Sequence, residues 1–167
     1  AYISEQIWRQ VVELKKVKPV VVSMGNVAAS GGYYISCAAN KIIAEPNTLT
    51  GSIGIFGMFP NASGLFGKLA LTTDIVKTNT FSDLGDLSRP MTESEKALIQ
   101  GYVERGYQTF LSRCAEGRGM TTEAVNAIGQ GRVWTGEQAK ERGLVDELGG
   151  IELAISTAAG LADLDQY

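Results

Sequence analysis

One serine in this sequence stands where a catalytic nucleophile could be held. Ser30 lies in the segment Ala28-Ala29-Ser30-Gly31-Gly32-Tyr33, between a short β-branched run and a helix-like segment of small and aromatic residues. The N-terminus of a helix directs backbone N–H groups and a positive dipole end toward such a position. Because Gly31 has no side chain, its N–H could approach an oxyanion that forms on a scissile carbonyl. Ser-Gly-Gly is also a common plain helix cap, so the segment by itself leaves both interpretations open.

The base that would activate this serine cannot be a histidine. The chain has 167 residues and no histidine among them, which excludes a Ser-His-Asp or Cys-His catalytic set within the chain. Lysine is the known alternative base for serine. The commonest zinc ligand is absent as well, and the neighbouring acidic residues are not spaced as metal ligands. We therefore expect no metal and no cofactor; the acidic residues in question are Asp83, Asp86, Glu93 and Glu95.

Composition narrows the class of protein further. The formal net charge is -3, and the 15 Lys and Arg residues are spread along the chain, so we expect no nucleic-acid partner. No stretch approaches the about 18 apolar residues that would span a bilayer. Cys37 and Cys114 are far apart without a CxxC spacing, which favours small buried side chains over a disulfide. The chain begins Ala-Tyr-Ile, without Met, and this suggests a piece of a longer protein.

The elements expected in the first half alternate between helix and strand. A helix is predicted from Ile3 to about Lys16, with Ser4 as a possible cap. The apolar run Val20–Val22 predicts a buried parallel strand. Further strands are predicted at Lys41–Ala44 and Thr73–Lys77, while residues 50–57 fit either a strand or a glycine-rich turn.

The second half is predicted to be mostly helical. Thr92-Glu93-Ser94-Glu95 has the form of a capping box, and an apolar stripe from Leu98 to Cys114 predicts a long helix that ends near Gly117 and Gly119. Alternating strands and helices followed by a helical part indicate an α/β layered domain. Three more helices are expected at 122–128, from Thr135 to Gly143, and at 148–161.

Several spaced motifs together resemble one known family. The segment Val27–Ser36 resembles the nucleophile segment of the signal peptide peptidase A family, also called protease IV. The resemblance implies a Clp-protease/crotonase-like α/β fold, and a Ser-Lys dyad that hydrolyses signal peptide remnants and other hydrophobic peptides. The resemblance implies that Ser30 is the nucleophile and that Ser52 orients the lysine amine by a hydrogen bond. The other motifs that carry the resemblance are 49–55, 89–92, 131–136, 139–140 and 143–146.

The lysine of the dyad is missing from its expected place. Short members of the family carry it in a Lys-x-x-x-x-Lys-Asp stretch, which here reads Lys77-Thr-Asn-Thr-Phe-Ser82-Asp83. Ser82 cannot act as the base, because the pKa of a serine hydroxyl is far too high. Lys77 could reach the site instead, although the odd offset between the two positions puts their side chains on opposite faces of a strand.

The favoured explanation is that the lysine lies on another repeat. Long members of the family have two repeats in tandem, with the serine on the C-terminal repeat and the lysine on the N-terminal one. Residues 1–167 are then a single catalytic-type domain, the C-terminal repeat of a longer protein. The family also has a Ser-Pro-Gly-Gly turn before the first helix, which supplies a second oxyanion donor. Without it and the lysine, we expect the isolated chain to be inactive.

Partners and rival functions follow from the same resemblance. It implies a membrane-associated protein that self-assembles, with its catalytic domains on the extracytoplasmic side of a bacterial inner membrane. The expected partners are peptide substrates, the N-terminal repeat and further copies of the protein. The apolar stretch from Phe56 to Phe66 could be core, a wall of a substrate groove or a subunit contact. The rival functions are a non-catalytic scaffold repeat and a crotonase-type acyl-CoA enzyme.

Overall fold

The computed structural model describes residues 2–166 and divides the chain into two compact units. The first unit comprises Ala1–Ile55 and Gly106–Tyr167, and the second comprises Phe56–Arg105. The assignment of residues 1–167 to one catalytic-type domain stays a prediction.

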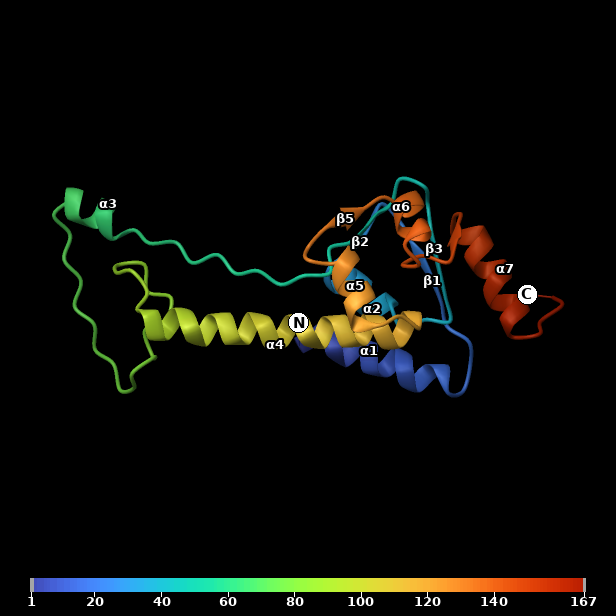
Figure 1. Cartoon of the computed structure of the whole chain (residues 1–167), viewed down its shortest axis with the longest axis horizontal. Coiled ribbons are helices and arrows are strands. Elements are labelled where there is room, and N and C mark those ends of the chain that lie inside the picture. The colour runs from blue at the N-terminus through green and yellow to red at the C-terminus, as the bar shows by residue number, and fades with distance from the viewer. Residues whose placement is uncertain (1, 167) are drawn as a thin grey trace. The chain divides into compact units, whose positions relative to one another are not determined.

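A parallel sheet lies at the centre of the first unit (Figure 1). It contains β1 (Val21–Met24), β3 (Lys41–Ala44) and β6 (Glu147–Leu148) in the order β1-β3-β6, and both pairs of neighbours are parallel. The predicted strands at 20–22 and 41–44 are thus confirmed. Only Met24 of β1 is buried, because β1 lies at the edge of the sheet, whereas the central strand β3 is buried from Ile42 onward.

A second small sheet carries the segment that contains the candidate nucleophile. Its order is β2-β4-β5, where β2 is Val27–Ala29, β4 is Leu49–Gly51 and β5 is Val133–Trp134. β2 and β4 are parallel, and β4 and β5 are antiparallel. Of residues 50–57, only Thr50 and Gly51 are therefore in a strand. β2 and β5 were not predicted, because strands of two or three residues are too short to show a period.

Helices cover both sheets in the first unit. α1 packs against α2, and α7 packs against β1 and β3 (Figure 1). Ser4 lies inside α1, so the prediction that it caps this helix is wrong. The last helix begins at Ile151 instead of Leu148, because residues 147–148 form β6. The helices of this unit are α1 (Tyr2–Lys15), α2 (Gly31–Ser36), α5 (Thr122–Ile128), α6 (Gly136–Glu141) and α7 (Ile151–Leu161).

The core of the first unit joins α2 to the first sheet and to the end of the long helix α4 (Glu93–Arg118). Cys37 and Cys114 are both buried in this core as free thiols, which confirms the interpretation of the two cysteines as small buried side chains. The Cys37 thiol donates to the Tyr34 carbonyl at 3.1 Å. A hydrogen bond between Cys114 and Cys37, together with burial, raises the pKa of the Cys114 thiol. The most buried core side chains include Tyr33, Ile42, Ile43, Ile53, Val125 and Leu144.

The second unit contains α3 (Ser63–Lys68) and the start of α4. The predicted capping box at α4 is confirmed: the Glu95 N–H donates to Thr92 Oγ1 at 3.3 Å, and the Thr92 N–H donates to Glu95 Oε2 at 2.7 Å. The predicted strand at Thr73–Lys77 is wrong, because these residues are exposed and pair with no other strand. Strand propensity alone does not form a strand where no neighbouring strand offers its hydrogen-bonding groups.

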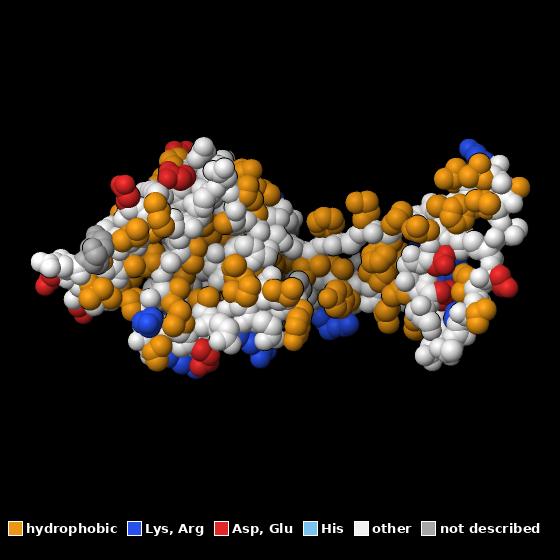
Figure 2. Space-filling view, turned by 180° about the vertical axis from the view of Figure 1, so that it is seen from behind, with side chains coloured by type: hydrophobic (Ala, Val, Ile, Leu, Met, Phe, Trp, Pro, Cys, Tyr) orange, Lys and Arg blue, Asp and Glu red, His pale blue; other side chains and the backbone are white. Residues whose placement is uncertain are grey.

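Apolar side chains lie on the surface of the second unit as well as the first (Figure 2). Phe56 is 86% exposed and Met58 is 82% exposed, so this part of the apolar stretch is not core. The choice between a groove wall and a subunit contact stays open. Among the described residues, no helix is long and apolar enough to cross a membrane.

Candidate active site

Ser30 lies at the junction between the end of β2 and the start of α2. Its backbone has φ 53° and ψ -115°, a conformation that costs a non-glycine residue of order 1–3 kcal/mol. Hydrogen bonds on both sides hold it there: the Ser30 N–H donates to the Gly51 carbonyl at 2.8 Å, and the Tyr34 N–H donates to the Ser30 carbonyl at 2.8 Å. The side chain is exposed and makes no capping hydrogen bond. A strained serine on a strand-to-helix turn, with a free hydroxyl, is the placement typical of a nucleophile.

The helix that follows Ser30 is anchored by two buried tyrosines. The Tyr33 hydroxyl donates to the Leu144 carbonyl at 2.9 Å, and burial raises its pKa. The Tyr34 hydroxyl donates to Glu5 Oε2 at 2.6 Å, and the same carboxylate accepts from Arg113 at 2.9 Å. These hydrogen bonds connect α2 to α1, to α4 and to the segment before β6. They therefore hold α2, and with it the turn at Ser30, in a fixed position.

Glu5 is the charged residue at the centre of this group of hydrogen bonds, and it should make the free energy of unfolding depend on pH. Burial raises its pKa, but hydrogen bonds from Arg113, Tyr34 and Arg9 outweigh burial and lower it to about 2. A carboxyl with a depressed folded-state pKa stabilises the fold above its ordinary pKa, and this contribution is lost as the pH falls toward 2. We expect Glu5→Gln to lower the free energy of unfolding at pH 7 by roughly 1–2 kcal/mol, after allowance for solvent screening.

Urea unfolding of Glu5→Gln and the wild-type chain between pH 7 and pH 2.5 measures this effect. The difference in stability between the two chains should shrink as the pH falls below about 4.5, because Glu5 of the unfolded chain becomes protonated there while folded Glu5 stays ionised until the pH approaches 2. Glu13→Gln is the matched control on the same helix, since Glu13 pairs only with the exposed Lys16. A difference that is constant over this pH range would contradict the role given to Glu5.

Gly31 is the first residue of α2, as its predicted role as an oxyanion donor requires. The first N–H groups of a helix have no acceptor within the helix, so the Gly31 N–H is available at the same turn as the Ser30 hydroxyl. A β-carbon on Gly31 would lie 3.0 Å from Ser4 Oγ. The sequence thus misassigned Ser4 as a cap, whereas the structure places its hydroxyl beside Gly31. The oxyanion role itself stays a prediction.

Ser52 is brought close to Ser30 by the pairing of β2 and β4. Ala29 is the register partner of Gly51, so the two serines follow the ends of adjacent parallel strands. Ser52 also has a positive φ, 49°, and so does Gly51, at 76°. Its N–H donates to the Arg132 carbonyl at 2.8 Å. The structure therefore places both predicted serines at the C-terminal ends of two adjacent strands of one sheet, although nothing in it tests whether Ser52 orients a lysine.

The turn at Ser52 packs against Trp134, a contact that the sequence analysis did not predict. A β-carbon on Gly51 would lie 2.9 Å from Trp134 Cδ1, so the indole fits directly against the Gly51 backbone. The Trp134 indole N–H donates to the Ile128 carbonyl at 3.0 Å, and the Arg142 guanidinium carbon lies over the indole, 3.9 Å from the ring centroid. A tryptophan beside a helix cap gave no signal of this contact, because the contact joins residues far apart in the chain.

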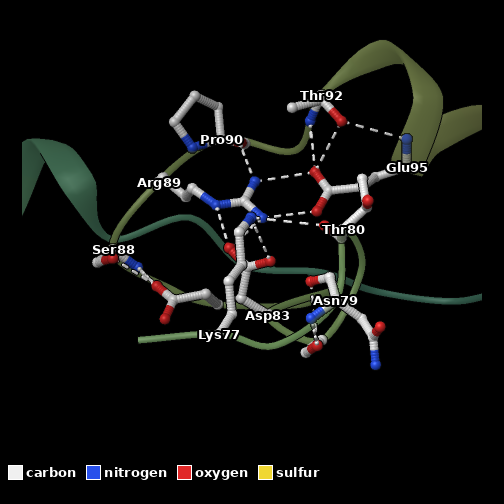
Figure 3. Close-up of polar contacts among 11 residues, drawn as sticks. Lys77, Asn79, Thr80, Asp83, Ser88, Arg89, Pro90, Thr92 and Glu95 are labelled. Atoms are coloured by element: carbon white, nitrogen blue, oxygen red, sulfur yellow. Dashed lines mark hydrogen bonds and ion pairs between the residues drawn. The ribbon is translucent and has the colours of Figure 1, made fainter. Parts of the chain in front are cut away.

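The stretch that was compared with the family's lysine segment belongs to the second unit, and Figure 3 shows polar contacts of several of its residues, Lys77 and Asp83 among them. Lys77 Nζ lies 3.0 Å from Asp83 Oδ1, and Ser82 Oγ donates to the Asn79 carbonyl at 3.1 Å. Arg89 joins Asp83 to Glu95, with contacts of 2.7 and 2.6 Å. Hydrogen bonds from Lys77 and Arg89 lower the pKa of Asp83. Lys77 is therefore engaged as the cation of an ion pair.

Among the described residues, no lysine forms a hydrogen bond with Ser30 or Ser52. Within residues 2–166 there is also no group of three or more His, Cys, Asp or Glu side chains that could hold a metal ion. The site as described offers a nucleophile, a backbone donor and a second hydroxyl. The lysines that form ion pairs are Lys16, Lys41, Lys77 and Lys96.

A serine at a strained strand-to-helix turn within a layered α/β fold is an arrangement found in hydrolases that use a serine nucleophile. The profile of peptidase family S49 matches residues 12–165. The chain therefore belongs to peptidase family S49.

Named relatives agree with this assignment. Protease 4 of Salmonella typhi is 45% identical over 90% of the chain, and the chloroplastic serine protease SPPA of Arabidopsis thaliana is 38% identical over 98%. The signal peptide peptidase SppA of Enterococcus faecium is 39% identical over 93%. The chain spans about a quarter of the length of the first two, 24% of each, and 46% of the third.

A solved structure confirms the fold class. The S97A mutant of the 1510-N membrane-bound stomatin-specific protease aligns with 96% of this chain and 64% of its own, at a TM-score of 0.57 and 15% identity. The chain therefore has the α/β fold expected from the sequence, of the Clp-protease/crotonase-like class, with a parallel sheet flanked by helices and a helical C-terminal part. An enoyl-CoA hydratase/isomerase family protein from Hyphomonas neptunium aligns at a TM-score of only 0.43, a level at which the likeness says nothing about function.

Proposed function

We propose that this chain is the nucleophile-bearing domain of a serine endopeptidase that uses a Ser-Lys dyad. Ser30 attacks the scissile carbonyl, the Gly31 N–H donates to the oxyanion, and Ser52 orients the amine of the lysine. The observation that carries the proposal is the backbone of Ser30, held at φ 53° by hydrogen bonds on either side while its hydroxyl stays free. Membership of peptidase family S49 supports the same chemistry.

The lysine is supplied by another segment of a longer protein. Two features support this: residue 82, where the resemblance to short family members places the lysine, is a serine, and Lys77 is paired with Asp83 at 3.0 Å. The chain also spans only 24% of the length of Protease 4 of Salmonella typhi. In the proposed arrangement, an N-terminal repeat of the same protein carries the lysine.

Labelling with a fluorophosphonate probe tests the nucleophile in the longer protein. Attack of Ser30 Oγ on the phosphorus atom forms the Oγ–P bond and expels fluoride, while the lysine takes the hydroxyl proton. The labelled tryptic peptide should contain Ser30, and Ser30→Ala should remove the label. A label on a different serine, or none in a protein that hydrolyses peptides, would overturn the assignment.

The isolated 167-residue chain should have no measurable peptidase activity. Without a base, the serine hydroxyl is not activated at neutral pH, and general-base catalysis alone contributes typically 10²–10⁴-fold. The measurement is hydrolysis of a fluorogenic apolar peptide by the purified chain beside its Ser30→Ala variant. Activity that depends on Ser30 would show that the chain contains its own base.

The substrates proposed are signal peptide remnants and other hydrophobic peptides. We also propose a membrane-associated homo-oligomer with this domain on the extracytoplasmic side of a bacterial inner membrane. The name of the Enterococcus faecium relative supports the substrate class, and the exposed apolar side chains of the second unit suit contacts between subunits. Sedimentation of the longer protein in detergent tests the oligomer.

The same exposed side chains favour one alternative function, a non-catalytic repeat that serves assembly. It predicts that Ser30→Ala leaves proteolysis by the longer protein unchanged while charged substitutions at Phe56 or Met58 disperse the oligomer. The two proposals therefore differ in the outcome of a single substitution.

A further inference from the structure

The two cysteines of the chain form a buried pair at the end of the helix that follows Ser30. Cys37 is the residue at which α2 ends, and Cys114 lies near the C-terminal end of α4. Both side chains are fully buried in the same core cluster. The Cys37 thiol lies 3.5 Å from the carbonyl oxygen of Arg113, the residue next to Cys114, and the Cys114 side chain is hydrogen-bonded to that of Cys37. The two sulfur atoms are therefore neighbours within one chain.

The backbones that carry the two thiols also approach each other closely. A β-carbon on Gly117 would overlap the Cys37 carbonyl group, and Gly117 follows Cys114 by about one turn of α4. A disulfide requires α-carbons that are within about 7 Å of each other. Because α2 and α4 meet here backbone against backbone, the two thiols can be joined with little movement of either helix.

A bond between these thiols would close a loop around the whole second unit. Cys37 precedes Phe56–Arg105 in the chain, and Cys114 follows it. The two parts of the first unit, Ala1–Ile55 and Gly106–Tyr167, are continuous along the chain only through the second unit. The bond would join these two parts directly. Cross-links that close long loops restrict the unfolded chain most, so the expected stabilisation is large.

We propose that Cys37 and Cys114 are a redox-sensitive pair, which forms a reversible disulfide and locks the helix after Ser30 to α4. The oxidant is a low-molecular-weight disulfide such as oxidised glutathione. One protein thiolate attacks it and releases one small thiol, and the second then attacks the mixed disulfide and releases the other. Two electrons and two protons pass from the protein thiols to the small disulfide. This inference goes beyond the proposed function and does not depend on catalysis by Ser30.

Burial makes the reaction conditional on an opening of the fold. The thiolate is the reactive form of cysteine, and the hydrogen bond between the two side chains, together with burial, raises the pKa of Cys114. The folded chain therefore keeps the pair reduced and out of reach of the oxidant. The disulfide forms when α2 and α4 separate briefly, or before the chain has folded. Urea at a concentration well below the unfolding midpoint should accordingly speed its formation.

Brief digestion of the purified chain with trypsin detects the bond directly. Residues 69–82 are exposed and lie outside helices and strands, so an early cut is expected after Lys77, between the two cysteines. Chain that has been treated with oxidised glutathione in low urea should give two pieces that stay joined in a denaturing gel until dithiothreitol is added. Mass mapping should find Cys37 and Cys114 in one linked pair of peptides.

Urea unfolding measures the effect of the lock on stability. The unfolding equilibrium constant of the oxidised chain should be about 30- to 900-fold smaller than that of the reduced chain. Cys114→Ala is the matched control, because it leaves Cys37 without a partner thiol. This variant is compared only with itself in oxidising and reducing buffer, so the cost of the lost sulfur cancels, and its unfolding midpoint should be the same in both.

Pieces that separate without dithiothreitol would overturn the proposal, whether the thiols stay free or each carries glutathione. A bond between two copies of the chain in place of one within it would do the same. So would an oxidised chain that is no more stable than the reduced one, since the bond would then not lock the native arrangement of α2 and α4. None of these results bears on the labelling of Ser30, so the nucleophile and the thiol pair can fail separately.

Discussion

Replacing Ser30 with alanine is expected to lower kcat/KM for peptide hydrolysis by the longer protein about 10⁴-fold or more. The residual rate would come from substrate binding and from backbone donors such as the Gly31 N–H, which do not need the hydroxyl. The alanine keeps a β-carbon at φ 53°, so the backbone strain at this position is unchanged. The measurement is steady-state hydrolysis of a fluorogenic apolar peptide.

Ser156→Ala is the matched control, since Ser156 lies on α7 and donates only to the Leu153 carbonyl of its own helix. It should leave kcat/KM unchanged. A loss of less than tenfold for Ser30→Ala would assign catalysis to another residue. Circular dichroism of both variants should match that of the wild type, which separates loss of the nucleophile from loss of the fold.

Ser30→Gly tests whether the backbone conformation of Ser30 lowers the stability of the fold. Glycine adopts positive φ without a steric penalty, so this variant should be as inactive as Ser30→Ala and about 1 kcal/mol more stable than it. A strained residue persists where function requires it and the surrounding structure enforces it. If the two variants were equally stable, the conformation of Ser30 would carry no energetic cost, and its placement would lose its main physical support.

The sequence predicted the elements with local signals and missed those that depend on distant partners. The capping box at Thr92 is confirmed, because a capping box is completed by residues three apart, and the helix predicted to start at Thr135 begins with a second one. β2 and β5 were missed, and the strand at 73–77 was wrongly predicted, because only pairing across the fold decides these cases. Residues far apart in sequence, such as Ala29 and Gly51, meet only through such pairing.

The candidate site divides in the same way. Ser30 and Gly31 could be singled out from one short segment, since the strand, the serine and the glycines are consecutive. Ser52 was selected only through the resemblance to a family, and its place beside Ser30 follows from the register of β2 and β4. The anchor formed by Glu5, Tyr34 and Arg113 gave no signal, because its members come from three helices.

Gly117→Ala is expected to cause the largest loss of stability of any single methyl group added to the first unit near α2. A β-carbon there would lie 2.1 Å from the Cys37 carbonyl oxygen and 3.1 Å from Ala38 Cα. These are backbone atoms at the end of α2, so no side chain can move aside, and the two helices must separate. Overpacking of this kind costs typically 1–3 kcal/mol, and it exceeds the about 1 kcal/mol that alanine gains over glycine within a helix.

Urea unfolding measures the net change, and Gly160→Ala on α7 is the matched control. A β-carbon at Gly160 has no atom within 4 Å, so this variant should be as stable as the wild type or up to about 1 kcal/mol more stable. Because α2 begins at the residue after Ser30, separation of α2 from α4 should also slow fluorophosphonate labelling of Ser30 in the longer protein. If Gly117→Ala were as stable as Gly160→Ala, the close approach of α4 to α2 would be wrong, and with it the support beneath the nucleophile.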